Sequence, residues 1–157
     1  MTFFQYGGFG RRIMAFLIDN ILLQTAATFV FLLGLSLVDS DMDLATLSSL
    51  PFLYYLIAVT MNLFYFTYFH SITGQTVGKR ILGLRVITTA GEPLKARQAF
   101  LRWVGYLVSA AFFYLGFIWV AFDSRKQGWH DKIAGTLVVR VDLHPEGVQP
   151  DLSAKIP

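Results

Sequence analysis

IMAFLIDNILLQTAATFVFLLGLSLV occupies residues 13–38 and forms a long apolar run. At about 1.5 Å of rise per residue, a helix of this length crosses a hydrocarbon core of about 30 Å. The whole chain is 55% hydrophobic and 15% charged, with a mean hydropathy of +0.54. Soluble domains are about 45–50% apolar and about 25% charged. The composition therefore predicts a small integral membrane protein and argues against a disordered chain or a soluble enzyme.

Two further apolar stretches follow, at about 50–69 and 103–122. Residues 81–88 and 136–141 are instead β-like, because they are rich in branched side chains. We therefore expect an all-α membrane protein with two transmembrane helices, a third spanning or re-entrant segment, and a small cytoplasmic β-hairpin that pairs 81–88 with 136–141. Residues 1–142 are expected to form one membrane domain, and 143–157 a loose C-terminal tail.

The distribution of charge predicts the orientation of the first helix. Arg11 and Arg12 precede it, and Asp39, Asp41 and Asp43 follow it. Lys and Arg gather on the cytoplasmic side of membrane proteins. We expect a multi-pass protein of the bacterial inner membrane, with a cytoplasmic N-terminus and the 39–49 loop outside.

The third apolar stretch leaves two arrangements open. A single crossing would place the cationic Arg125 and Lys126 outside, against the charge rule. A re-entrant hairpin with a break near Gly116 keeps both β-like runs on one side, although about 20 residues are too few to cross twice. Residues 93–102 are expected to form a short interfacial helix with Arg97 and Arg102 toward water.

Asp19 is the most informative polar residue, because a carboxylate inside a membrane helix is costly and is usually paired or functional. Arg12 lies two turns away on the same side of the helix, and Asn20 and Gln24 flank that side. Arg12 and Asp19 are about 10 Å apart along the axis, so each is expected to have another partner. The candidate partners are Asp131, Asp123 and Arg102.

Other motifs argue against an enzyme or a cofactor site. Residues 74–79 lack the spacing of a phosphate-binding loop, and Lys79, Arg80 and Arg85 are expected to contact lipid head groups. His130 and Asp131 are too few for a zinc site, and the chain has no cysteine. We expect no catalytic residue, no metal and no cofactor.

Four blocks of sequence resemble a known family. They are GRRIMAFLID at 10–19, GQTVGKRILGLRV at 74–86, Arg102 before the third stretch, and GWHDKIAGTLVV at 128–139. In this order they resemble the RDD family of bacterial membrane proteins, over roughly residues 7–140. The family is named for one Arg and two Asp. Arg12 and Asp19 match the first two, and the second Asp is either Asp123 or Asp131. The biochemical role of the family is poorly defined, although transport has been suggested for it. The resemblance therefore implies fold and location more than activity.

Two functions remain open from the sequence. The first is transport-related, with a cation or proton coupled through Asp19, and with Asn20 and Gln24 as nearby oxygen ligands. The alternative is a non-catalytic membrane interaction or assembly module, in which Arg12, Asp19 and a C-terminal Asp form a structural lock. Both imply the lipid bilayer and either a homo-oligomer or a larger membrane partner, and neither involves nucleic acid.

Overall fold

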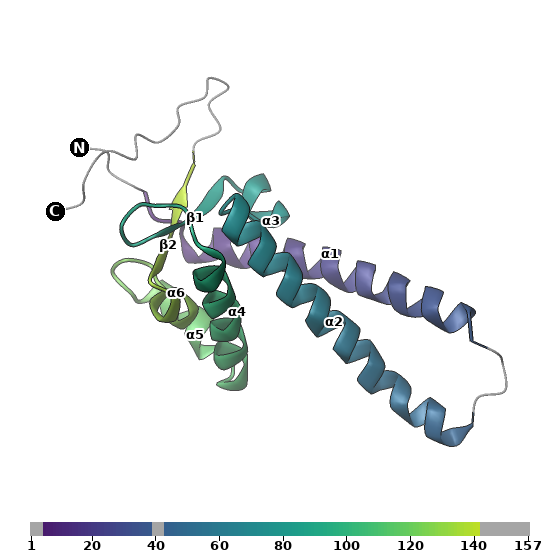
Figure 1. The fold of residues 1–157 in the computed structure, drawn as a ribbon. Coiled ribbons are helices and arrows are strands. Elements are labelled where there is room, and N and C mark those ends of the chain that lie inside the picture. Colours follow the sequence, from purple (N-terminus) through teal and green to yellow (C-terminus); the bar gives the residue numbers. More distant parts are fainter. Residues whose placement is uncertain (1–4, 39–42, 142–157) are drawn as a thin grey trace.

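The computed structural model describes residues 5–38 and 43–141 (Figure 1). The elements in these ranges are α1 (Phe9–Ser36), α2 (Leu44–Ile72), α3 (Val77–Ile81), β1 (Leu84–Thr88), α4 (Ala96–Ala111), α5 (Leu115–Ile118), the 3-10 helix η1 (Trp119–Ala121), α6 (Trp129–Ala134) and β2 (Thr136–Arg140). The predicted tail at 143–157 and the acidic residues Asp39 and Asp41 lie outside the described residues.

Two long helices form a hairpin that extends away from the rest of the molecule (Figure 1). α1 has 28 residues and α2 has 29, and both are long and apolar enough to cross a membrane. The two predicted spans are confirmed, although α2 begins before residue 50. It begins early because the Asp43 carboxylate accepts a hydrogen bond of 2.9 Å from the Thr46 N–H and so caps the helix.

The third apolar stretch is broken rather than continuous. α4 and the α5–η1 segment are bent by 112° relative to each other. The predicted break near Gly116 is misplaced, since the chain turns at residues 112–114, where Phe113 and Tyr114 have positive φ angles of 52° and 59°. Gly116 instead lies within α5, where a Cβ atom would clash with Ser109 of α4. It allows close approach of two helices and does not make the turn.

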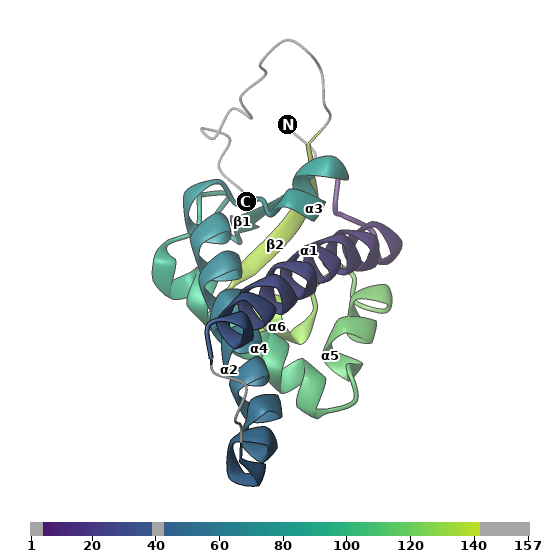
Figure 2. The same cartoon turned by 90° about the vertical axis from the view of Figure 1, so that its right-hand side faces the viewer.

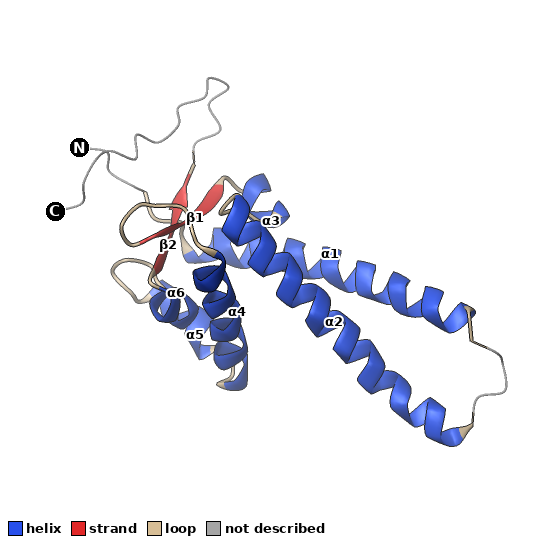
Figure 3. Cartoon of the chain, in the orientation of Figure 1, coloured by secondary structure: helices blue, strands red, loops and turns tan. Residues whose placement is uncertain are grey.

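The two strands form an antiparallel pair at one end of the helical hairpin (Figure 3). Leu84 lies opposite Arg140, and Thr88 lies opposite Thr136. The predicted pairing is confirmed, except that 81–83 belong to the end of α3 and a turn in which Gly83 has a φ of 61°. Because the strands precede and follow the α4–η1 segment, both ends of this segment lie at the same end of the molecule. This favours a returning segment over a single crossing.

Two clusters of buried apolar residues hold the layers together. One joins α1 to the sheet through Ala15, Leu84 and Val138, and the other joins α1, α2 and α4 through Leu23, Phe66, Trp103 and Tyr106. Figure 2 shows α1 between α2 on one side and α5 on the other, with β2 behind it. Arg12 and Asp19 of α1 therefore face other parts of the protein, whereas Arg11, Gln24 and Thr25 are exposed.

Candidate functional site

The carboxylate of Asp131 joins three helices. Asp131 Oδ2 accepts a hydrogen bond of 2.7 Å from Arg12 Nη1 of α1, and Oδ1 accepts one from Arg102 Nη1 of α4. The N–H of Gly128, just before α6, donates to Oδ2 at 3.0 Å. The Asp131 side chain is fully buried. We call Arg12, Arg102 and Asp131 the Asp131 lock.

The two guanidinium groups also tie this lock to the start of β2 and to the backbone. Arg102 donates to Thr136 Oγ1 at 2.6 Å, and Arg12 donates to the Gly7 carbonyl at 2.9 Å. Arg102 is only 1% exposed, so the expectation that it faces water is wrong. The buried carboxylate of Asp131 draws the guanidinium inward, because a buried charge requires a partner of opposite sign.

The lock determines the protonation of its acid and of the neighbouring His130. Burial alone would raise the pKa of Asp131, but the guanidinium of Arg102, helped by Arg12, holds it well below its usual range. Burial lowers the pKa of His130 to about 3, although the charge of Asp131 opposes this shift. At neutral pH the carboxylate is therefore ionised and the imidazole is neutral.

Asp19 has its own set of partners, which does not include Arg12. Its carboxylate accepts hydrogen bonds from Tyr65 Oη at 2.7 Å, Thr76 Oγ1 at 2.5 Å and the Gly78 N–H at 2.8 Å. Among the described residues, no Lys, Arg or His nitrogen lies within 4.0 Å of it. We call Asp19, Tyr65, Thr76 and Gly78 the Asp19 lock. It joins α1 to α2 and α3.

Asn20 and Gln24, which flank Asp19 on α1, form hydrogen bonds with other groups. Asn20 Nδ2 donates to the Phe16 carbonyl of its own helix at 2.7 Å, and Gln24 Oε1 accepts from Tyr54 Oη at 3.1 Å. Both side chains line a second cavity of about 230 Å³ between α1, α2 and α4. The predicted role of Asn20 and Gln24 as oxygen ligands of a cation near Asp19 stays a prediction.

Asp123 and Asp131 have different surroundings. Asp123 pairs with Lys132, whose side chain is 45% exposed, and Asp123 Oδ1 accepts a 3.0 Å hydrogen bond from the Arg125 N–H. The hydrogen bond from Lys132 lowers the pKa of Asp123. Of the two acids, Asp131 is the one that contacts Arg12.

The three basic residues expected at lipid head groups also differ. Arg80 is exposed, and Arg85 is half-buried and donates to the Thr73 carbonyl at 3.1 Å. Lys79 is buried at 6% exposure, so a head group that contacts this residue has to enter the protein interior. Its Nζ lies 3.0 Å from Nε2 of the fully buried His70 and 5.7 Å from the centre of the Phe66 ring.

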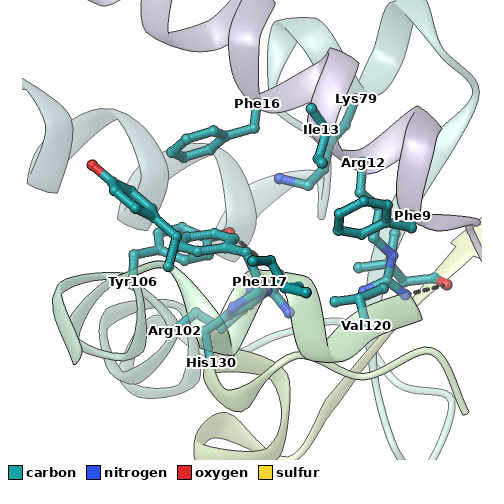
Figure 4. A pocket seen from close by; sticks show the side chains of 13 residues that line it. Phe9, Arg12, Ile13, Phe16, Lys79, Arg102, Tyr106, Phe117, Val120 and His130 are labelled. Carbon is teal, nitrogen blue, oxygen red and sulfur yellow. Dashed lines mark hydrogen bonds between the residues drawn. The ribbon is translucent and has the colours of Figure 1, made fainter. Parts of the chain in front are cut away.

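A cavity of about 190 Å³ lies between α1, α3, α4, α5 and α6 (Figure 4). Its walls are mainly aromatic and aliphatic, and its polar lining comes from Arg12, Lys79, Arg102 and His130. We call this space the cationic cavity. Nothing in the sequence signalled it, because its lining residues come from seven separate elements, which include η1 and β2.

No metal site is found in residues 5–38 and 43–141, where no three His, Asp or Glu side chains gather closely enough to hold an ion.

Two spanning helices, a bent helix pair and a buried Arg–Asp cluster define a small helical membrane protein. The RDD family profile matches residues 6–135, and the chain belongs to the RDD family. The chain is 33% identical to the uncharacterized protein YxaI of Bacillus subtilis, over 84% of this chain and 95% of that protein. It is 31% identical to YteJ of the same organism, an uncharacterized membrane protein, over 88% and 84% of the two chains. No solved structure matches the chain.

Proposed function

We propose that this protein is a non-enzymatic binding and assembly module of the bacterial cytoplasmic membrane. The main support for this proposal is the position of Asp131. Its carboxylate accepts hydrogen bonds from both Arg12 of α1 and Arg102 of α4. Removing one partner of such a buried pair leaves an uncompensated charge, so each member stabilises the fold. The locks serve to maintain the arrangement of helices around the cationic cavity.

The proposed orientation places the sheet end of the molecule in the cytoplasm. Arg11, Arg80 and Arg97 lie on the elements at this end, and the far end of the hairpin begins α2 with Asp43. Excess Lys and Arg mark the cytoplasmic side. The N-terminus is then cytoplasmic, and the α4–η1 segment enters the bilayer and returns.

The second candidate function is transport of a cation or proton coupled through Asp19. It is favoured by the place of a fully buried carboxylate inside a helix that can span the membrane. The three hydrogen bonds of 2.5–2.8 Å that Asp19 accepts from Tyr65, Thr76 and Gly78 favour the structural role instead. For this reason transport ranks second.

One experiment separates the two functions. Wild type and Asp19→Asn are reconstituted in proteoliposomes, and flux of Na⁺, K⁺ and protons is measured beside thermal unfolding in detergent. We expect no flux from either protein and a lower unfolding temperature for the variant. Wild-type flux that disappears in an equally stable variant would overturn the binding module in favour of transport.

We also propose that the protein assembles with a second copy or with a larger membrane partner. Large apolar side chains project outward from the distal halves of α1 and α2, among them Phe29, Leu33, Phe52 and Tyr55. A single copy has only two crossing helices and one returning segment with which to enclose a pathway or a partner site. A second copy or a larger partner would supply the missing walls. Cross-linking in native membranes, followed by mass measurement in a mild detergent, tests this: a band of monomer mass alone contradicts it.

A further inference from the structure

The cationic cavity carries an imbalance of charge. Arg12, Lys79 and Arg102 line it, and no Asp or Glu of the described residues does. The nearby buried acids are Asp131, which both arginines share, and Asp19, which accepts from neutral donors. Three cations against two carboxylates leave one positive charge in excess.

The excess charge belongs to Lys79. In the described part of the chain, no carboxylate oxygen lies within 4.0 Å of its ammonium, and its hydrogen-bond partner is His70 Nε2. An ammonium has three N–H donors, so two remain available. Figure 4 shows the side chain reaching into the cavity, between Phe16 and Arg12. A buried cation without an acid is costly, and an anion in the cavity would complete the site.

Arg102 and His130 also line the cavity, and each has one nitrogen that is unpartnered within residues 5–38 and 43–141. Nε of Arg102 and Nδ1 of His130 are buried and have no hydrogen-bond partner among the described residues. Burial lowers the pKa of Lys79, and an anion beside the ammonium opposes this shift. The charged side chains at the polar end of the cavity are therefore all N–H donors, and no carboxylate of the described residues lines it.

The rest of the cavity is apolar and opens toward lipid. Phe16, Phe117 and Val120 line its walls, while Ile13 and Ile118 line it and are also exposed on the outer surface of α1 and α5. A cavity of about 150 Å³ binds a molecule of the size of benzene, so about 190 Å³ accommodates a group of at least that size. This is enough for a small head group and the first carbons of a chain.

We infer that the cationic cavity binds the anionic head group, a carboxylate or phosphate, of an acyl-chain amphiphile, with Lys79 as its charged contact. The chain leaves past Ile13 and Ile118 into the bilayer. This inference rests on the proposed binding function and names its ligand class. A small soluble anion fits less well, because the mouth of the cavity is lined by exposed apolar side chains in a region predicted to face lipid.

The test uses the full chain in a neutral maltoside detergent, with binding followed by native mass spectrometry. The probes are palmitate, phosphatidylglycerol and inorganic phosphate, with phosphatidylcholine as the neutral control. Lys79→Met removes the buried charge, and Arg97→Gln, which removes an exposed charge of α4 outside the cavity lining, is the matched control. We expect Lys79→Met to weaken palmitate or phosphatidylglycerol binding by about tenfold or more, and Arg97→Gln to change it by less than about twofold.

A second variant tests the path of the acyl chain without changing the charge. Ile118→Trp adds bulk at the mouth and should weaken the acyl ligands while leaving any phosphate binding unchanged. This variant also decides the question if Lys79→Met does not fold. Unchanged acyl binding in Lys79→Met, equal losses in Arg97→Gln, or inorganic phosphate binding as tightly as the acyl ligands would each overturn the inference. Ion flux in wild-type proteoliposomes would contradict the proposed function instead. The two failures can be distinguished, because the binding assay contains no ion gradient and does not measure transport.

Discussion

Arg12 and Asp131 lie 119 positions apart in the chain, yet Nη1 of the arginine is 2.7 Å from Oδ2 of the aspartate. The pair connects the first turn of α1 to α6, which lies directly before β2. An arginine near the start of the domain and an aspartate near its end thus meet in its interior. Arg102, from α4, completes the contact.

Asp131→Asn should destabilise the protein strongly. The change leaves two buried guanidinium groups without their acid, which costs about 3–5 kcal/mol in comparable buried pairs. Asp123→Asn is the matched control, because its partner Lys132 is largely exposed and such pairs contribute about 0–1 kcal/mol. Unfolding midpoints in detergent measure both. Equal losses in the two variants would contradict the assignment of Asp131 to the lock.

Tyr65→Phe tests the Asp19 lock without removing the carboxylate. The tyrosine hydroxyl donates to Asp19 at 2.7 Å and accepts from the Val77 N–H at 3.0 Å. Loss of both hydrogen bonds should lower the stability by about 1–3 kcal/mol. Tyr68→Phe, at a ring that is 60% exposed, should change it by less than about 0.5 kcal/mol. If the two variants unfold at the same temperature, the lock does not stabilise the fold.

Gly78→Ala should separate α3 from α1. A Cβ atom at residue 78 would clash with the backbone carbonyl of Ala15, which cannot move without shifting the helix. We expect a loss of about 2 kcal/mol or more. Gly10 lies in α1 with open space around it, so Gly10→Ala should be neutral or stabilise by up to about 1 kcal/mol. Thermal unfolding distinguishes them, and a stable Gly78→Ala protein would contradict the close approach of the two helices.

His130 should make the stability depend on pH. Its pKa is about 3 in the folded protein and about 6.5 when unfolded, so the unfolded state binds more protons between these values. Stability should therefore fall as the pH falls from about 6.5 toward 3, by up to about 1.4 kcal/mol per pH unit. His130→Phe keeps the ring packed beside Tyr106, 4.7 Å between centroids, and should flatten this slope above pH 4. An unchanged slope would assign the pH dependence to another group.

The returning path of the α4–η1 segment can be tested with single cysteines, because the chain has none of its own. Arg97 and Ser124 are exposed on either side of this segment, and Leu44, 82% exposed, lies at the far end of the hairpin. An impermeant maleimide should label Arg97→Cys and Ser124→Cys from the same side of the membrane, and Leu44→Cys from the other. Labelling of residues 97 and 124 from opposite sides would establish a single crossing.

The long elements are predictable from local sequence because their signals are local. A run of apolar residues as long as 13–38 specifies a spanning helix, and clusters of branched residues specify β1 and β2. The turn at Phe113 and Tyr114 is different, since non-glycine residues adopt positive φ angles there only under tertiary constraint. The sequence predicts the break near Gly116, because glycine is common at turns. In the structure, the small size of Gly116 instead allows α5 to pack against α4.

The candidate site is only partly predictable, for a related reason. Asp19 stands out in sequence as a charge in an apolar run, while Arg12 and either Asp123 or Asp131 stand out through the resemblance to the RDD family. Which of them pair is decided by the tertiary fold, which brings Asp131 to Arg12 and surrounds Asp19 with hydroxyl and N–H donors. Lys79 lies in a polar stretch typical of a cytoplasmic loop, and its sequence gives no indication that it is buried beside His70.

The long separation between Arg12 and Asp131 also sets an order of events during synthesis. At about 5–20 residues per second, a ribosome needs roughly 6–24 s to add the 119 residues between them. Asp19 obtains Tyr65, Thr76 and Gly78 after half that length, so α1 joins α2 and α3 well before its arginine meets an acid. A nascent chain that stops before α6 leaves Arg12 and Arg102 unneutralised in or near the bilayer. The Asp131 lock can therefore form only after most of the domain has been synthesised.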